Sequence, residues 1–219
     1  MADAYVPDRL FARLFQPWTL PVTDWGLAQE DWSRVDAITS LPWAGRIVDV
    51  GSGDGTLGAM VCSRNPAVFG LEGVESDPAQ RARARRLWRQ HRINDGGAAR
   101  LSWHGVSEMR PTPTVIRLLG TRVAGGFDGA LVCEVLEHLS VAAGTAILRA
   151  VKGVCRSGAL VCVTVPDPDG SRWRYPGHIT PYRVPALRAM LASAGFQMAA
   201  IRRIGRATPP IWVMIVGHA

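Results

Sequence analysis

From Arg46 onward, apolar runs of strand length alternate with longer segments of helical periodicity, and this alternation constrains the fold more than any other feature. Such alternation is typical of βαβ units, whose strands pair in a mostly parallel sheet. We expect strands near 46–50, 68–75, 101–104, 129–134, 159–165, 197–204 and 210–216, and helices near 56–64, 78–92, 115–119, 141–154 and 181–194. The sequence thus predicts a Rossmann-like, doubly wound α/β fold with a seven-stranded, mostly parallel sheet and an antiparallel last strand.

The length of 219 residues suits a single domain. Residues 1–42 are rich in aromatic residues and prolines, so we expect them to form an N-terminal helical cap or lid on a core of residues 43–219. No apolar run approaches the roughly 20 residues that span a bilayer, and the chain start lacks the features of a signal peptide. The four cysteines show no CxxC spacing. We therefore expect a cytoplasmic protein with reduced thiols, monomeric or homodimeric, without membrane insertion.

A net charge of +7 favours an anionic partner such as nucleic acid. However, Lys152 is the only lysine, and genome composition alone can produce such a bias towards arginine. The arginine-rich segment 81–92 belongs to the crossover after the second strand, where a solvated helix is expected. The charge therefore leaves both an RNA partner and a small-molecule partner open.

A glycine-rich turn follows the first predicted strand. The buried segment 47–50 leads into Gly51-Ser52-Gly53-Asp54-Gly55, and a helix begins near Thr56. Doubly wound sheets bind nucleotides at this place. Glycines let the backbone approach a ligand and adopt positive φ, and the helix start offers N–H groups to an anionic group. The turn alone is also compatible with a dinucleotide site or a purely structural role.

Glu75, at the end of the second predicted strand, can accept both hydroxyls of a ribose. Glu72 lies within the strand, and Asp77 precedes Pro78, where capping the next helix is its natural role. About two dozen residues separate Gly51 from Glu75, a spacing that suits both dinucleotides and S-adenosylmethionine.

The segment Phe127–Leu139 decides between these ligands. With it, the chain resembles class I S-adenosylmethionine-dependent methyltransferases, specifically the branch of ubiquinone-biosynthesis O-methyltransferases and small-RNA 3′-terminal 2′-O-methyltransferases. The resemblance extends from about Trp43 to the end of the chain. It rests on these pieces in order: Val48–Gly55, Glu75, Phe127–Leu139, Gly158–Pro166 and Gly177–Phe196.

The resemblance implies a cofactor site at the carboxyl ends of the strands. Its expected members are Asp49, Gly51, Ser52, Gly53, Glu75, Val106 and Glu134. The adenine commonly rests beside 103–108, where many relatives carry an aspartate. This chain has Val106 in that place, so Ser107 or Glu108 would have to supply a polar contact.

The same resemblance indicates a chemical cluster. In some relatives a Glu-x-x-Glu-His segment and a later histidine bind a divalent metal, and Glu134, Glu137, His138 and His178 match that pattern. Such a site would suit magnesium or manganese. Other relatives carry the segment without a metal, and there the histidine is a base or a structural partner. His138 and His178 are the candidate general bases, because imidazole titrates near neutral pH.

The loop 167–177 combines aromatic residues with arginines, and Arg172, Trp173 and Tyr175 can line a pocket for a planar, anionic acceptor or simply cover the sheet edge. The sequence thus predicts an S-adenosylmethionine-dependent methyltransferase that acts on an oxygen of a small biosynthetic molecule. The alternatives are a metal-dependent 2′-O-methyltransferase of RNA ends, a non-catalytic cofactor-binding subunit and a nicotinamide oxidoreductase.

Overall fold

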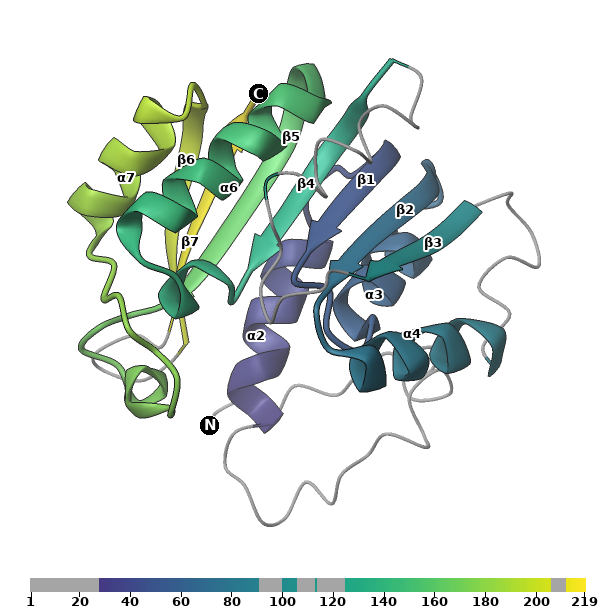
Figure 1. Ribbon diagram of the computed structural model, residues 1–219, viewed down its shortest axis with the longest axis horizontal. Helices are drawn as coiled ribbons and strands as arrows, with labels where there is room; N and C mark the ends of the chain where they lie inside the picture. Colours follow the sequence, from purple (N-terminus) through teal and green to yellow (C-terminus); the bar gives the residue numbers. More distant parts are fainter. Residues whose placement is uncertain (1–27, 91–99, 106–112, 114–124, 206–211) are drawn as a thin grey trace, which may run out of the picture.

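The computed structural model describes residues 28–90, 100–105, 113, 125–205 and 212–219 of the chain. At its centre lies a seven-stranded sheet in the order β3-β2-β1-β4-β5-β7-β6 (Figure 1). The strands are β1 (Gly45–Val50), β2 (Val68–Glu75), β3 (Arg100–Gly105), β4 (Phe127–Cys133), β5 (Cys155–Pro166), β6 (Gln197–Ile204) and β7 (Trp212–His218). The helices are α2 (Ala28–Thr39), α3 (Thr56–Arg64), α4 (Pro78–Gln90), α6 (Val141–Val154) and α7 (Val184–Ser193), with short 3-10 helices η2 (Leu136–His138) and η3 (Ser171–Arg174).

The sheet is parallel from β3 to β5, and β7 pairs antiparallel with both β5 and β6. The last strand is therefore antiparallel, as the sequence predicted. The strand order reverses between β1 and β4, whose carboxyl ends lie side by side through the pairing of Val50 with Val132. Open α/β sheets bind their ligands at such a reversal.

Helices cover both faces of the sheet. Ile38 of α2, Val61 of α3 and Leu87 of α4 belong to one buried cluster, with Ile47 and Leu131 of the sheet. The other cluster joins the sheet to α6 and α7 through Ile147, Val151, Leu187 and Leu191. Both faces of the central strands are thus removed from water, which explains why these strands are nearly continuous apolar runs.

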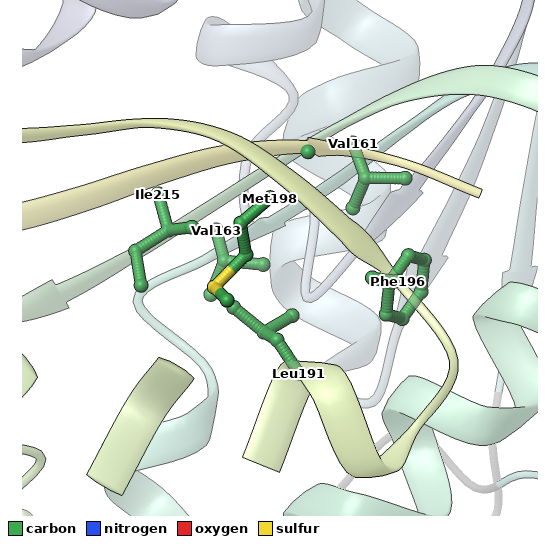
Figure 2. Close-up of a pocket in the computed structure, with 7 residues that line it drawn as sticks. Val161, Val163, Leu191, Phe196, Met198 and Ile215 are labelled. Carbon is green, nitrogen blue, oxygen red and sulfur yellow. The ribbon is translucent and has the colours of Figure 1, made fainter. Parts of the chain in front are cut away.

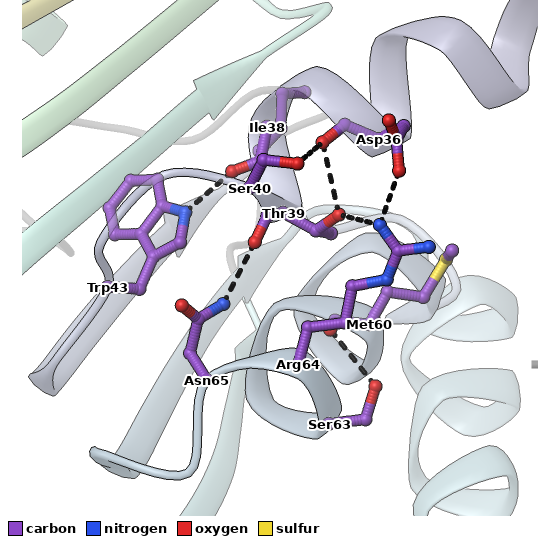
Figure 3. Close-up of polar contacts among 9 residues, drawn as sticks. All are labelled: Asp36, Ile38, Thr39, Ser40, Trp43, Met60, Ser63, Arg64 and Asn65. Atoms are coloured by element: carbon purple, nitrogen blue, oxygen red, sulfur yellow. Dashed lines mark hydrogen bonds and ion pairs between the residues drawn. The ribbon is translucent and has the colours of Figure 1, made fainter. Parts of the chain in front are cut away.

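Helix α2 is fastened to the core at its C-terminal end (Figure 3). The Arg64 guanidinium pairs with Asp36 at 2.6 Å and donates to the Thr39 hydroxyl at 2.8 Å. The Asn65 side chain donates to the Thr39 carbonyl at 3.1 Å, and the buried Trp43 indole donates to the Ile38 carbonyl at 2.8 Å. The expected N-terminal cap is thus helical over 28–39, and residues 1–27 lie outside the described part of the chain.

Two expected starts differ most from the structure. Strand β5 begins at Cys155 and not at 159, directly after α6, because Cys155 pairs with Phe127 and extends the ladder. Helix α7 begins at Val184 and not at 181, because Tyr182 is buried in the core and Arg183 is extended (φ −76°, ψ 151°). The expected helix 115–119 lies outside the described residues.

A small apolar pocket lies between α7 and the strands β5, β6 and β7 (Figure 2). Its lining consists of Val161, Val163, Leu191, Phe196, Met198, Ile215 and Gly217. None of these side chains can bind a charge or transfer a proton, so the pocket belongs to the packing of the core.

Candidate active site

The glycine turn is held at the end of β2 by backbone hydrogen bonds. The N–H groups of Gly51 and Ser52 both donate to the Val74 carbonyl, at 2.8 and 3.1 Å. Gly51, Gly53 and Gly55 have φ of 71°, 54° and 80°, a region that side chains disfavour. A Cβ on Gly51 would lie 2.5 Å from the Val135 side chain, whereas a Cβ on Gly53 would meet nothing within 4 Å. Gly53 therefore faces open space, as a ligand cradle requires.

The Glu75 carboxylate is hydrogen-bonded to this turn. One carboxylate oxygen accepts from the Gly53 N–H at 2.8 Å, and the other accepts from the Asp77 N–H at 2.8 Å. Asp77 in turn accepts from the Ala79 N–H at 2.8 Å at the start of α4, the capping role that the sequence suggested. The Glu75 carboxylate thus organises the turn at the place where the sequence predicts a ribose partner.

Glu134 follows β4 directly and is the only non-glycine residue with positive φ (57°) among the described residues. Its carboxylate accepts from the Thr164 hydroxyl and from the Trp212 indole N–H, both at 3.0 Å. The guanidinium of Arg34, from helix α2, lies 4.0 Å from the same carboxylate. Strained backbone of this kind is concentrated at functional sites, and here it turns the chain from β4 into η2.

Glu137, His138 and His178 form a compact cluster. One potential ligand atom from each lies within 4.8 Å of the others, and the two imidazole centroids are 4.8 Å apart. Glu137 is fully buried, and neither carboxylate oxygen has a hydrogen-bond partner. Burial raises the pKa of Glu137 to about 9, and the nearby charge of Glu134 contributes to the rise. The expected fourth member, Glu134, lies outside this cluster because Thr164 and Trp212 hold its carboxylate.

The loop after β5 is attached to η2 through the backbone. The Glu137 carbonyl accepts from the N–H groups of Ile179 and Thr180, at 2.8 and 3.1 Å. His138 Nδ1 lies 3.0 Å from the Gly177 carbonyl, and His178 Nδ1 lies 3.3 Å from the Trp173 carbonyl. Because a carbonyl oxygen can only accept, each Nδ1 must carry the proton. In the neutral ring, the lone pair is then on Nε2 of each imidazole.

A family model described as a methyltransferase domain matches residues 10–201. The chain belongs to this methyltransferase family. The methyltransferase domain has the fold of an O-methyltransferase family protein from Burkholderia thailandensis, at 16% identity and a TM-score of 0.64. That match covers 88% of this chain and 57% of the Burkholderia protein, so the chain spans little more than half of that protein's length.

Two further solved structures share the fold. Magnesium protoporphyrin IX methyltransferase from Synechocystis PCC 6803, solved with bound S-adenosylhomocysteine, is 12% identical with a TM-score of 0.62, and the match covers 86% of this chain and 83% of that one. The [4+2]-cyclase SpnF is 17% identical with a TM-score of 0.63, and the match covers 89% of this chain and 82% of SpnF. No curated protein matches the sequence. Among the described residues of the methyltransferase domain, no helix has the length and apolar character needed to cross a bilayer.

Family membership implies S-adenosylmethionine as the methyl donor, and the residues of the glycine turn fit it. Gly53 leaves the cradle open, and the Ser52 hydroxyl is buried without a hydrogen-bond partner. Asp49 is also buried, and its Oδ2 has no partner, but a Cβ on Gly58 would lie 3.2 Å from that atom. Asp49 is thus packed beneath α3. Val106, the expected adenine neighbour, lies outside the described residues.

The rim of the histidine cluster is aromatic. The rings of Trp173 and Tyr175 have centroids 5.5 and 5.8 Å from that of His178, and Tyr175 and Ile179 are exposed.

Three residues around Glu134, namely Arg34, Thr164 and Trp212, were not predicted from the sequence. The polar Thr164 within the apolar run of β5 was a detectable signal, whereas nothing in the sequence distinguishes Arg34 from the other arginines of the chain.

Proposed function

We propose that this methyltransferase domain transfers the methyl group of S-adenosylmethionine to a hydroxyl oxygen of a small molecule, and that His138 or His178 removes the hydroxyl proton. The observation that carries the proposal is the pair of imidazoles fixed through Nδ1 to backbone carbonyls. In this arrangement Nε2 of each neutral ring carries the lone pair and is the candidate acceptor for a proton.

The reaction requires few further groups from the protein. Bound S-adenosylmethionine supplies a methyl group already activated by its sulfonium. The chain must hold the acceptor oxygen in line with that methyl group and take its proton, so orientation and a modest base suffice. The aromatic rim of Trp173 and Tyr175 supports a planar acceptor, because such rings offer a large apolar surface for stacking. Proteins that share the fold include O-methyltransferases, so an oxygen acceptor is compatible with it.

A second candidate is metal-dependent transfer to the 2′-oxygen of an RNA end. It is favoured by Glu137, whose two buried oxygens have no partner and which lies within reach of His138 and His178. One carboxylate and two imidazoles suit manganese better than magnesium, which prefers oxygen ligands. A metal there would orient neighbouring hydroxyls and lower the pKa of one of them.

A third candidate is a cofactor-binding protein that transfers no methyl group. A [4+2]-cyclase shares the fold, and a fold alone does not determine chemistry.

We further propose that the protein is cytoplasmic and is a monomer or a homodimer. The four free cysteines support the cytoplasmic location, since disulfides are rare in reducing compartments.

Incubation with S-adenosylmethionine that carries a labelled methyl group separates these candidates. The acceptors are a panel of hydroxylated aromatic compounds and an RNA duplex with free 3′ ends, each with and without a chelator. Transfer to an aromatic hydroxyl that resists chelation supports the proposal. Transfer to RNA that the chelator abolishes supports the second candidate. Binding of S-adenosylhomocysteine without transfer to any acceptor supports the third.

A further inference from the structure

Helix α4 carries most of the positive charge of the protein. The chain has a formal net charge of +7, and the sequence of α4, PAQRARARRLWRQ, contains five arginines and no acidic residue. The rest of the chain therefore carries the two remaining net charges. A genome that favours arginine over lysine explains the choice of residue type. It does not explain why the charge is concentrated in one helix.

The packing of α4 directs arginines outward. The helix lies beside β2 and β3 (Figure 1), and Ala84 and Leu87 are buried in the core cluster on that side of the sheet. These two contacts fix the rotation of the helix about its axis. Arg83, Arg85 and Arg86 are exposed as a result. The basic side chains therefore form a solvent-facing surface rather than part of the core.

The arginines of α4 differ from others in the chain in what they contact. Five arginines outside α4 lie within 4.0 Å of a carboxylate, in the pairs Arg34–Glu134, Arg64–Asp36, Arg156–Asp128, Arg183–Asp169 and Arg203–Asp167. Arg81 of α4 donates instead to the backbone carbonyls of Glu75 and Ser76, at 2.7 Å each. No residue in the described part of the chain pairs with Arg83 or Arg86. Carboxylates of the protein thus leave the charge of these two side chains uncompensated.

The spacing of these arginines is unfavourable for the helix itself. Arg83 and Arg86 are three positions apart, and Arg81 and Arg85 are four positions apart. Side chains at these spacings are neighbours on a helix surface, and like charges there destabilise the helix. Because α4 contains no acidic residue, no opposite charge within the helix offsets the repulsion. An anionic partner would relieve it.

The residues between the arginines favour nucleic acid over a membrane surface. A helix that binds a membrane presents large apolar side chains beside its basic ones. The described side chains on the exposed face of α4, apart from the arginines, are Pro78, Ala79 and Ala82. The large apolar residues that are exposed in the described part of the chain lie on other elements. A phosphate backbone needs no apolar contact, and the guanidinium fork matches phosphate oxygens with two hydrogen bonds.

We propose that the exposed face of α4 binds the phosphate backbone of a nucleic acid through Arg83 and Arg86. Contacts of this kind are independent of base sequence. Helix α4 begins three residues after Glu75, so the bound strand lies beside the edge of the sheet that carries the glycine turn. The inference goes beyond the proposed function and does not depend on which acceptor is methylated.

Fluorescence anisotropy tests this inference with a labelled oligouridylate of about 20 nucleotides, which is longer than typical single-strand binding sites. The α4 variant combines Arg83→Gln with Arg86→Gln. At low salt it should bind the strand about tenfold more weakly than the wild type, or weaker still. A plot of log affinity against log salt should be less steep by about 1.4, because two phosphate contacts are lost.

The matched control combines Arg149→Gln with Arg188→Gln. Both arginines are exposed, on α6 and α7, so the control removes the same charge from the opposite face of the sheet. Its affinity and salt dependence should remain close to those of the wild type. Thermal melting establishes that each variant is folded. The α4 variant should melt no lower than the wild type, because the substitutions relieve like-charge repulsion and glutamine is also a good helix former.

Sedimentation with phosphatidylglycerol vesicles tests the membrane alternative with the same proteins. The inference is overturned if the wild type does not bind the strand, if the α4 variant binds it as the wild type does, or if both double variants weaken binding equally. It is also overturned if the vesicles, and not the strand, bind in a manner that depends on Arg83 and Arg86. None of these measurements requires methyl transfer, so their failure leaves the proposed function to its own test.

Discussion

His138 and His178 meet edge to face, with ring centroids 4.8 Å apart and ring planes inclined by 61°. The backbone carbonyls that hold their Nδ1 atoms, Gly177 and Trp173, come from the same loop. That loop is in turn attached to η2 through the Glu137 carbonyl. The loop and the end of β4 therefore form one unit, which fixes the tautomer of both imidazoles together.

We expect substitution of these histidines to reduce turnover without weakening cofactor binding. His138→Ala and His178→Ala each remove an imidazole that can take the acceptor proton, and the one that acts as the base should lower kcat by about 10²- to 10⁴-fold. The affinity for S-adenosylhomocysteine should be unchanged. The matched control is His218→Ala, because His218 is exposed at the end of β7 and contacts the Gly158 carbonyl. If both cluster variants retain full kcat, neither imidazole is the base.

We expect Gly53→Ala to weaken cofactor binding by more than the backbone strain of the substitution can explain, because Gly53 faces open space. Gly53 and Gly158 both have positive φ, 54° and 79°, and at both a Cβ would meet nothing within 4 Å. Gly53→Ala and Gly158→Ala should therefore cost similar stability, about 1 kcal/mol each, in urea denaturation. Only Gly53→Ala should weaken S-adenosylhomocysteine in calorimetry, because its methyl group enters the cradle. Equal affinities for the two variants would place the cofactor elsewhere.

We expect the unfolding free energy of the protein to depend on pH because of the buried carboxyl of Asp49. Burial, with a smaller contribution from the charge of Glu75, raises the pKa of Asp49 from 3.8 to about 7. Between these values the unfolded chain is ionised at Asp49 while the folded chain is protonated, so the unfolding free energy falls as the pH rises and levels off above about 7. Asp49→Asn removes this contribution.

The variant should therefore gain stability relative to the wild type as the pH rises from about 4 to about 7, by at most about 4 kcal/mol. Urea denaturation across this range measures the difference. A constant difference between the two proteins at every pH would show that Asp49 titrates as it does in the unfolded chain.

Glu137 distinguishes the metal-free mechanism from the metal-dependent one. Because burial raises the pKa of this carboxyl to about 9, it is protonated at neutral pH when no metal is bound. Glutamine is then a close neutral substitute, so Glu137→Gln should retain most of the activity, and a chelator should not change the wild-type rate. A metal needs the ionised carboxylate, so loss of activity in both experiments would favour the metal-dependent candidate.

The sequence predicted the elements that position the cofactor turn, because local patterns specify them. The helix Thr56–Arg64 and the strand Val68–Glu75 have the expected bounds. Their signals are a glycine turn and an apolar run, both of which act within a few residues. The start of β5 was missed because it depends on pairing with Phe127, a contact between residues far apart in the sequence.

The candidate site was only partly predictable for the same reason. Glu137, His138 and His178 come together as the motif suggested. Glu134 does not join them, because its carboxylate is held by Thr164 and Trp212, which only the tertiary structure brings near. Arg34 was not found from the sequence, since the packing of α2 against α3 gives it its place.

Calorimetric titration of the wild-type chain with S-adenosylhomocysteine and, separately, with NAD⁺ tests the central claim most directly. The open cradle at Gly53, with Glu75 beside it, predicts saturable binding of S-adenosylhomocysteine and no binding of NAD⁺. Binding of NAD⁺ without binding of S-adenosylhomocysteine would contradict the account, because the glycine turn would then serve a dinucleotide.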